Sequence, residues 1–150
     1  MSLGEPLTIL LVEDDPAHVE IVRRSLAAFR VANRVVYAAD GQAALDYLMP
    51  RDGPADSSAG PRPHLVLLDL RLPKVDGLEV LRQVKADATL RSLPVAILTT
   101  STAESDMVDA YALGAGAYLV KPVDMDKLTR VLGAFGFYWL AWNRHPGEPT

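Results

Sequence analysis

The sequence predicts an α/β fold in which five parallel strands form one sheet with helices on both faces. Five short apolar runs alternate with five segments whose apolar residues recur at helical spacing. The run over 65–68 has four large aliphatic residues in a row, which is typical of a strand buried on both faces. Strands that alternate with helices form parallel sheets in doubly wound folds, so we expect a (βα)5 domain.

The length and the amount of apolar sequence indicate a single domain. The chain has 150 residues, 49% of them hydrophobic, which is enough for one sizeable core. We expect this core over about 7–135, an aromatic helical extension over about 136–144 and a flexible tail over 145–150, with no output domain.

The composition also excludes several classes of function. A net charge of −4 argues against nucleic-acid binding, which needs a clustered basic face. The absence of cysteine excludes disulfide scaffolds, thiol catalysis and cysteine-ligated metals. No apolar stretch is long enough to span a bilayer and no signal pattern opens the sequence, so we expect a cytoplasmic protein without a membrane partner.

An acidic loop separates the first predicted strand from the first helix. The apolar run over 7–12 stops at Glu13, Asp14 and Asp15. Asp15 before Pro16 is a typical helix N-cap followed by proline at the first helical position. The apolar residues of this helix share one face and are Val19, Val22, Leu26 and Phe29.

The other four units repeat the alternation. The expected strands cover 35–38, 65–68, 95–98 and 117–120, and the expected helices begin near Asp40, Leu78, Glu104 and Asp124. Residues 50–63 contain four prolines and two glycines without apolar periodicity, which indicates a long surface loop. Such a loop is either a tolerated insertion, the reading we prefer, or a partner site.

Polar residues stand where four of the five predicted strands end. Glu13 and Asp14 follow the first strand, Asp69 the third, Thr99 the fourth and Lys121 the fifth. The carboxyl ends of strands border the crevice in which open α/β sheets bind ligands. If the strands take the flavodoxin-like order 2-1-3-4-5, the first and third strands are neighbours and their carboxylates meet.

Carboxylates that lie together repel one another unless a cation sits among them. Oxygen ligands suit a hard divalent ion, and Mg²⁺ is the ion that fits best. Such a site suits phosphoryl transfer, with Asp69 as nucleophile, the Lys121 ammonium neutralising charge and Thr99 supplying a hydroxyl. Asp69 can instead be a metal ligand only or a loop cap, although a charge at the end of a buried strand is costly unless paired.

With these residues in this order, the sequence resembles the receiver domains of two-component response regulators. The resemblance covers roughly 7–135. It rests on Glu13-Asp14, on Asp69 with Pro73 and Gly77 after it, on Thr99, and on Lys121-Pro122. It implies a phosphoacceptor in a histidine–aspartate phosphorelay, with at most self-phosphorylation and self-dephosphorylation activity rather than a classical enzyme.

The resemblance also implies a role for each site residue. Asp69 would accept a phosphoryl group from a histidine of a sensor kinase. Asp14 and Asp69 would bind Mg²⁺ directly, Glu13 through water, and Arg71 through its backbone carbonyl. The family's lysine corresponds to Lys121, whose peptide bond to Pro122 is expected to be cis. Thr99 and Tyr118 match the switch pair that reports phosphorylation to the face of the fourth helix, fifth strand and fifth helix.

A closer resemblance is to stand-alone response regulators of bacterial phytochromes. It rests on the Glu13-Asp14-Asp15-Pro16-Ala17 opening, the long loop before the third strand, Thr99-Thr100-Ser101 and the aromatic C-terminal helix. It implies a phytochrome kinase as partner and a homodimer. The dimer face would use Phe135, Tyr138, Trp139 and Trp142. Arg71 stands where many of these relatives carry asparagine.

Three other functions are weighed against this one. A phosphatase of the haloacid dehalogenase type also uses a strand-end aspartate with Mg²⁺, but it needs a second aspartate where Arg71 stands. A flavodoxin-like flavin binder needs an anion cradle after the first strand, and the acidic residues Glu13 to Asp15 would repel a phosphate. A receiver that signals without phosphorylation is disfavoured by the intact set of site residues.

Overall fold

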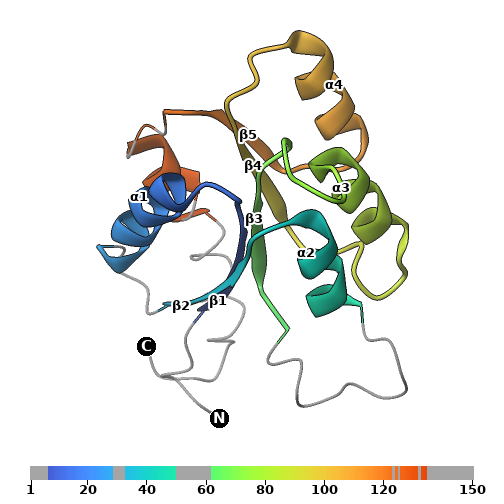
Figure 1. Ribbon diagram of the computed structural model, residues 1–150, viewed down its shortest axis with the longest axis horizontal. Coiled ribbons are helices and arrows are strands. Elements are labelled where there is room, and N and C mark those ends of the chain that lie inside the picture. Colours follow the sequence, from blue (N-terminus) through green and yellow to red (C-terminus); the bar gives the residue numbers. More distant parts are fainter. Residues whose placement is uncertain are drawn as a thin grey trace, which may run out of the picture.

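The computed structural model describes residues 7–28, 33–49, 62–122, 124, 126–131 and 133–134. Its centre is a five-stranded sheet in the order β2-β1-β3-β4-β5, and every neighbouring pair is parallel (Figure 1). The strands are β1 (Leu7–Val12), β2 (Asn33–Ala38), β3 (Leu65–Leu68), β4 (Val95–Thr99) and β5 (Ala117–Val120). The predicted fold class and strand order are confirmed.

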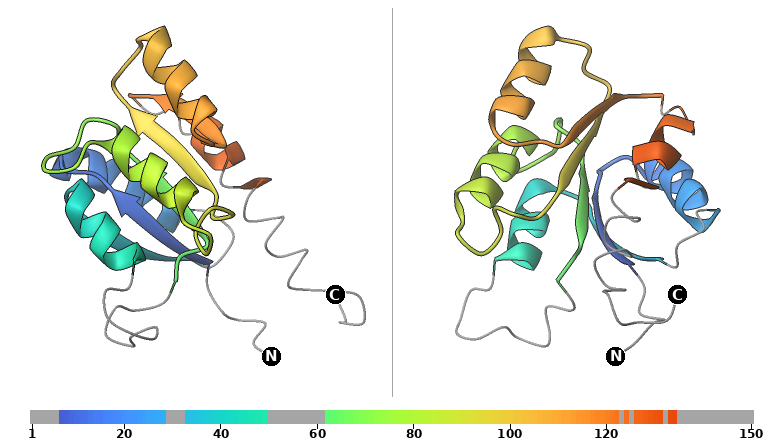
Figure 2. Two further views of the ribbon diagram at one scale, coloured as in Figure 1. Left: turned by 90° about the vertical axis from the view of Figure 1, so that its right-hand side faces the viewer. Right: turned by 180° about the vertical axis from the view of Figure 1, so that it is seen from behind.

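The helices lie on both faces of the sheet. They are α1 (Pro16–Ala27), α2 (Gly41–Leu48), α3 (Gly77–Ala86) and α4 (Glu104–Ala112), and residues 126–131 are also helical. Figures 1 and 2 show α2, α3 and α4 on one face and α1 with the helical segment after β5 on the other. The chain therefore winds in both directions from β1 and β3, which places the ends of these two strands at the point where the winding reverses.

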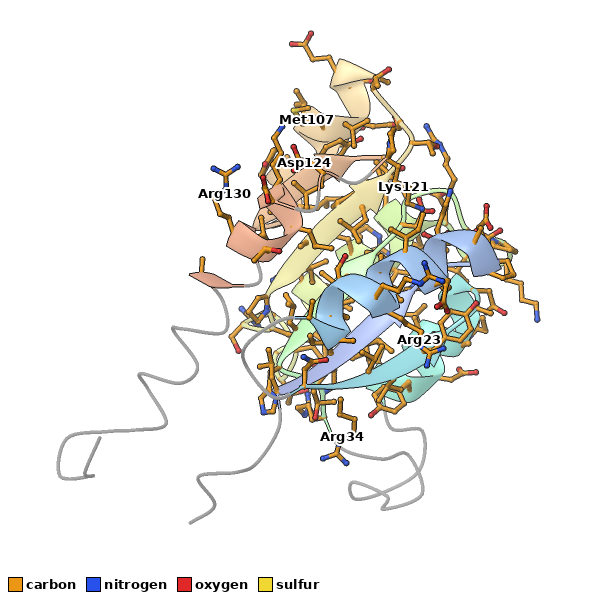
Figure 3. All side chains as sticks on the ribbon, turned by 90° about the vertical axis from the view of Figure 1, so that its left-hand side faces the viewer. Arg23, Arg34, Met107, Lys121, Asp124 and Arg130 are labelled. Carbon is orange, nitrogen blue, oxygen red and sulfur yellow. The ribbon has the colours of Figure 1, made fainter. Side chains whose placement is uncertain are left out.

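Two apolar layers hold the helices to the sheet, because alternate strand residues point to opposite faces. One layer packs Leu10, Val66 and Ile97 against α2, α3 and α4, and the other packs Ile9, Leu67 and Leu98 against α1 and Leu128. The central strands β1, β3 and β4 are buried over their whole length. Charged side chains such as Arg34 and Arg130 point away from this core (Figure 3).

The helix starts follow the predicted capping chemistry. The Asp15 side chain accepts a hydrogen bond from the backbone N–H of Ala17 at 2.9 Å, and Pro16 opens α1. Asp124 accepts from the N–H groups of Asp126 and Lys127 at the predicted start of the fifth helix. Helix α4 differs from the others because Ala110 is its single buried residue.

Two strands are longer than the apolar pattern indicates, and β4 gains only Thr99, which pairs with Val120. β2 begins at Asn33 rather than at Val35, because Asn33 and Arg34 pair with Leu7 and Thr8 in the ladder. β2 is an edge strand, where backbone pairing continues through polar residues. Most of the predicted loop over 50–63 and the aromatic residues from 135 onward lie outside the described residues. Within the described residues, no helix is long and apolar enough to cross a membrane.

Candidate functional site

The sheet brings the predicted strand-end residues to one edge. Val12 pairs with Leu68 in the parallel ladder, so the residues that follow these strands leave the sheet side by side. The backbone N–H of Asp69 donates to the Val12 carbonyl at 3.0 Å. On the other side, the N–H of Lys121 donates to the Thr99 carbonyl at 2.7 Å. The backbone of the sheet therefore sets the positions of these side chains.

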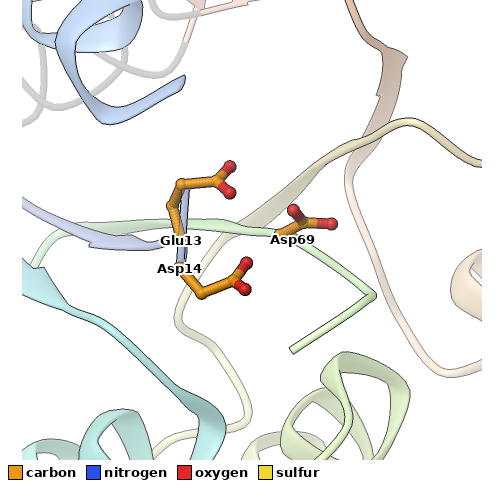
Figure 4. Close-up of side chains that lie close together, drawn as sticks. All are labelled: Glu13, Asp14 and Asp69. Atoms are coloured by element: carbon orange, nitrogen blue, oxygen red, sulfur yellow. The ribbon is translucent and has the colours of Figure 1, made fainter. Parts of the chain in front are cut away.

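Three carboxylates meet at this edge. Each of Glu13, Asp14 and Asp69 offers an oxygen, and these atoms all lie within 4.8 Å of one another (Figure 4). Glu13 and Asp69 are buried, with 2% and 6% of their surface exposed, whereas Asp14 is exposed. Two carboxylates of the cluster are thus buried and the third lies at the surface, so an ion or a phosphoryl donor can reach the cluster from the side of Asp14.

The Lys121 ammonium lies against two of the three carboxylates. Its Nζ donates to Asp69 Oδ2 at 3.0 Å and also to Glu13 Oε1. The lysine side chain is 4% exposed, so it points inward from the end of β5. The Lys121–Pro122 peptide bond is cis, as the resemblance implied.

The charge balance of the cluster suits a divalent cation. Three carboxylates and one ammonium leave two uncompensated negative charges at the site. Burial raises the pKa of the Glu13 carboxyl, and this effect outweighs the opposing hydrogen bond from Lys121. A hard divalent ion with oxygen ligands would offset both the repulsion and the desolvation, so the residues fit the Mg²⁺ that the sequence implies.

The loop after Asp69 is fitted closely to the phosphoacceptor candidate. The Arg71 N–H donates to Asp69 Oδ1 at 3.1 Å, so it holds the carboxylate oxygen that Lys121 does not contact. A Cβ at Gly77 would lie 2.2 Å from the Asp69 carbonyl oxygen, closer than atoms can approach, so α3 starts against the backbone of the site. This contact explains why Gly77 follows Asp69 at this spacing.

The two predicted switch residues are connected through Ser101. Thr99 is fully buried, and its Oγ1 accepts from the Ser101 N–H at 3.3 Å. The Tyr118 hydroxyl donates to the Ser101 carbonyl at 3.2 Å. The Tyr118 ring also lies 6.4 Å from that of Tyr111 on α4, measured between centroids. A change at Thr99 therefore has a short route to β5 and α4.

The structure adds two residues to which sequence reasoning gave no role. His18 Nδ1 lies 2.9 Å from Lys121 Nζ, and Asp106 on α4 is paired with Arg71. His18 stands one helical turn before the buried Val22. This spacing in α1 places His18 on the face of the helix that packs on the sheet, which was a signal available in the sequence. Asp106 had none, because it lies 35 residues from its partner.

Two groups of predicted residues remain without a structural test. The proposed dimer residues Phe135, Tyr138, Trp139 and Trp142 lie outside the described part of the chain. The predicted metal ligand at Arg71 is its carbonyl, whereas the contact observed at Asp69 is made by its N–H. Both assignments stay predictions.

Comparison with known proteins identifies the family of this site. The sequence profile of the response regulator receiver domain matches residues 9–133. The probable methanogenesis regulatory protein FilR2 of Methanothrix harundinacea is 46% identical over 147 residues, which cover 98% of this chain and 92% of FilR2. Response regulator Rcp1 of Synechocystis sp. is 38% identical over 135 residues and 90% of each chain.

Solved structures give the same result. The phosphorylated cyanobacterial phytochrome response regulator RcpA superposes with a TM-score of 0.76 at 36% identity, over 92% of this chain and 96% of RcpA. The Mn²⁺-bound form of Rcp1 gives a TM-score of 0.75 at 34% identity, over 97% of this chain and all of Rcp1. These matches support a receiver domain, and they support neither a haloacid-dehalogenase-like phosphatase nor a flavodoxin-like binding module.

Proposed function

Because the chain belongs to the family of response regulator receiver domains, we propose that Asp69 is the residue that accepts the phosphoryl group. The observation that carries this proposal is the position of its carboxylate. It is buried at the end of a central strand, with two further carboxylates beside it and the Lys121 ammonium 3.0 Å away. The phosphoryl donor is a phosphohistidine of a sensor kinase.

In the transfer step, a carboxylate oxygen of Asp69 attacks the phosphorus atom of the phosphohistidine. The phosphorus–nitrogen bond breaks, its electron pair stays on the imidazole nitrogen, and an acyl phosphate forms on Asp69. Lys121 neutralises charge on the phosphoryl oxygens during this step. The Arg71 N–H, which donates to Asp69 Oδ1, keeps the carboxylate oriented for attack.

The same carboxylates are suited to hold the metal. Asp14 and Asp69 would bind Mg²⁺ directly, Glu13 through water and Arg71 through its carbonyl. When bound, the ion supplies charge neutralisation for the moving phosphoryl group. The Mn²⁺-bound structure of Rcp1 supports a divalent ion in this family, and the uncompensated charge of the cluster supports one in this chain.

Phosphorylation would be read by Thr99 and Tyr118. The hydroxyl of Thr99 turns toward the phosphoryl group, and the Tyr118 ring moves into the space that it leaves. The hydrogen bonds of both residues to the backbone of Ser101 support this coupling, because they connect the two side chains through one intervening residue. The signal leaves through α4, β5 and the helix that follows.

A sensor kinase of the phytochrome class is the proposed partner. RcpA and this chain share fold and 36% identity, and RcpA is a phytochrome response regulator. FilR2 is more similar in sequence, at 46% identity, but its name assigns it to the regulation of methanogenesis. Phosphotransfer from a panel of purified sensor kinases distinguishes a phytochrome partner from a partner of the kind that FilR2 has. We expect preferential transfer from a phytochrome kinase.

The proposal extends to the domain arrangement, the partners, the location and the intrinsic chemistry of the chain. The chain acts as a single receiver domain without nucleic-acid contacts, forms a homodimer through its C-terminal aromatic residues, and works in the cytoplasm. Its own chemistry is limited to self-phosphorylation from small donors and self-dephosphorylation. The nearly complete coverage of FilR2 and Rcp1 supports the single-domain arrangement.

Labelling with acetyl phosphate and Mg²⁺ tests the role of Asp69. We expect the wild-type chain to gain the mass of one phosphoryl group, and Asp69→Asn to gain none, since an amide oxygen is a poor nucleophile. Asp109→Asn is the matched control, because it makes the same change on the exposed face of α4. Labelling that persists in Asp69→Asn would refute the assignment.

A further inference from the structure

Arg71, two residues beyond Asp69, has its side chain tied to helix α4 rather than to the carboxylate cluster. Its guanidinium donates to Asp106 Oδ2 in the first turn of that helix. The Arg71 side chain is 57% exposed, whereas that of Asp106 is 13% exposed. The arginine is therefore the movable member of the pair, and the aspartate is the fixed one.

Asp106 is fixed by a second donor. The Ser101 hydroxyl donates to the same Oδ2 atom at 2.6 Å. The N–H and the carbonyl of Ser101 are bonded to Thr99 Oγ1 and to the Tyr118 hydroxyl. One continuous set of hydrogen bonds thus connects the Arg71 guanidinium with both proposed switch residues.

We propose that Asp106 is a positioning residue, which holds the Arg71 guanidinium on α4 until Asp69 is phosphorylated. The inference rests on the proposed function of Asp69. An exposed ion pair is weak and screened by solvent, whereas a guanidinium binds a phosphoryl dianion through paired, charge-assisted hydrogen bonds. A phosphoryl group on Asp69 therefore draws Arg71 away from Asp106.

Movement of the Arg71 guanidinium has one consequence at Asp69 and another at α4. At Asp69, the guanidinium lies over the phosphoryl group and obstructs the water that would hydrolyse it. In that hydrolysis the water oxygen attacks phosphorus, the bond to the Asp69 oxygen breaks with its electron pair returning to the carboxylate, and dihydrogen phosphate leaves. At α4, Asp106 loses its cation and keeps the hydrogen bond from the Ser101 hydroxyl, while the Ser101 backbone is bonded to Thr99 and Tyr118. Asp106 thereby sets the lifetime of the phosphoryl group.

The lifetime of the acyl phosphate in four chains tests this role. Wild type, Asp106→Asn, Arg71→Ala and the double variant are phosphorylated with acetyl phosphate and Mg²⁺, freed of donor, and followed by phosphate-affinity gel electrophoresis. Asp106→Asn frees Arg71, so its phosphoryl group should persist about fivefold longer, the lower end of coupling effects between sites. Arg71→Ala should shorten the lifetime. In the Arg71→Ala background, Asp106→Asn should have no effect, because no guanidinium remains to be released.

Two controls separate positioning from mere structure. Asp106→Glu keeps a carboxylate and should restore a lifetime near that of wild type, and Asp109→Asn removes a charge elsewhere on α4 and should change nothing. An unchanged lifetime in Asp106→Asn, or an equal change with and without Arg71, overturns the inference while leaving Asp69 as phosphoacceptor. If the wild type is not phosphorylated at all, the proposed function fails and this inference fails with it.

Discussion

Two glutamates, each beside a cation, have opposite pKa shifts in this molecule. Glu13 lies in the strand-end cluster, contacts Lys121 and has a raised pKa, because burial outweighs the ion pair. Glu79 lies exposed on α3, accepts hydrogen bonds from Arg82 and Gln83, and has its pKa lowered to about 2. Both carboxyl groups have a cationic partner, so burial decides whether the pKa of a glutamate is raised or lowered in this molecule.

The two regions accordingly respond to acid in opposite ways. The raised pKa of Glu13 means that its contribution to stability is fully present below its unfolded value of 4.5 and is lost as the pH rises through the folded value. The lowered pKa of Glu79 gives a contribution that is present above 4.5 and is lost as the pH falls through about 2. Ionisation of Glu13 is therefore unfavourable in the folded site, because the carboxyl group is buried, whereas ionisation of Glu79 is favoured on the surface of α3.

The largest difference between the regions is expected when the cation is removed from each. Lys121→Met leaves the buried carboxylates without their partner, and we expect the free energy of unfolding without divalent ions to fall by about 3 kcal/mol. Urea unfolding in EDTA measures this change. Added Mg²⁺ should restore part of the loss, because binding to the folded state stabilises it.

Arg82→Met is the matched change on α3. The Glu79–Arg82 pair is exposed to solvent, so its loss should leave the unfolding curve within experimental error of the wild type. If Lys121→Met and Arg82→Met lowered the free energy of unfolding equally, burial would not be what distinguishes the two ion pairs.

A smaller effect, of the opposite sign, is expected at the exposed member of the cluster. Asp14→Asn removes one of the three like charges, so in EDTA the free energy of unfolding should rise by about 1 kcal/mol. The same variant should lose the stabilisation that Mg²⁺ gives to the wild type. Glu20→Gln, which changes an exposed carboxylate on α1, provides the control. A fall in stability for Asp14→Asn would mean that the uncompensated charge of the cluster has been overstated.

The smallest effect concerns the titration of Glu79. Carboxyl chemical shifts followed by NMR should show Glu79 titrating near pH 2, and Arg82→Met should return its pKa toward 4.5. Since the pair is exposed, added salt should do the same in part. A Glu79 pKa that is unchanged by Arg82→Met would remove the ion pair as the cause of the shift.

The fold and the positions of the strand-end residues could be predicted from the sequence because both depend on where strands end. Asp69 and Lys121 each follow an apolar run, and parallel strands bring such positions to one edge whatever their side-chain conformations. The same argument places Glu13 and Asp14 beside Asp69 only when β1 and β3 are taken as neighbours. The strand order, in contrast, came from resemblance, because apolar runs carry no information about which strand lies beside which.

The contacts between side chains could not be predicted in this way. The pairing of Arg71 with Asp106 depends on the rotation of α4 about its axis and on the direction that a long side chain takes from a loop. The position of His18 beside Lys121 depends on how α1 crosses the sheet. The start of β2 at Asn33 depends on pairing with β1, which polar residues permit and no apolar pattern reveals.

Helix α4 is attached to the rest of the domain by few buried atoms, since Ala110 alone among its nine residues is buried. Burial of apolar surface is the main free energy that fixes a helix in place, at roughly 25 cal/mol for each Å². A helix with so little of it can shift or tilt at low cost, whereas α3, with four buried residues, cannot. Helix α4 is thus held loosely and α3 tightly beside the same carboxylate, and we expect a chemical change at Asp69 to displace α4 more readily than α3.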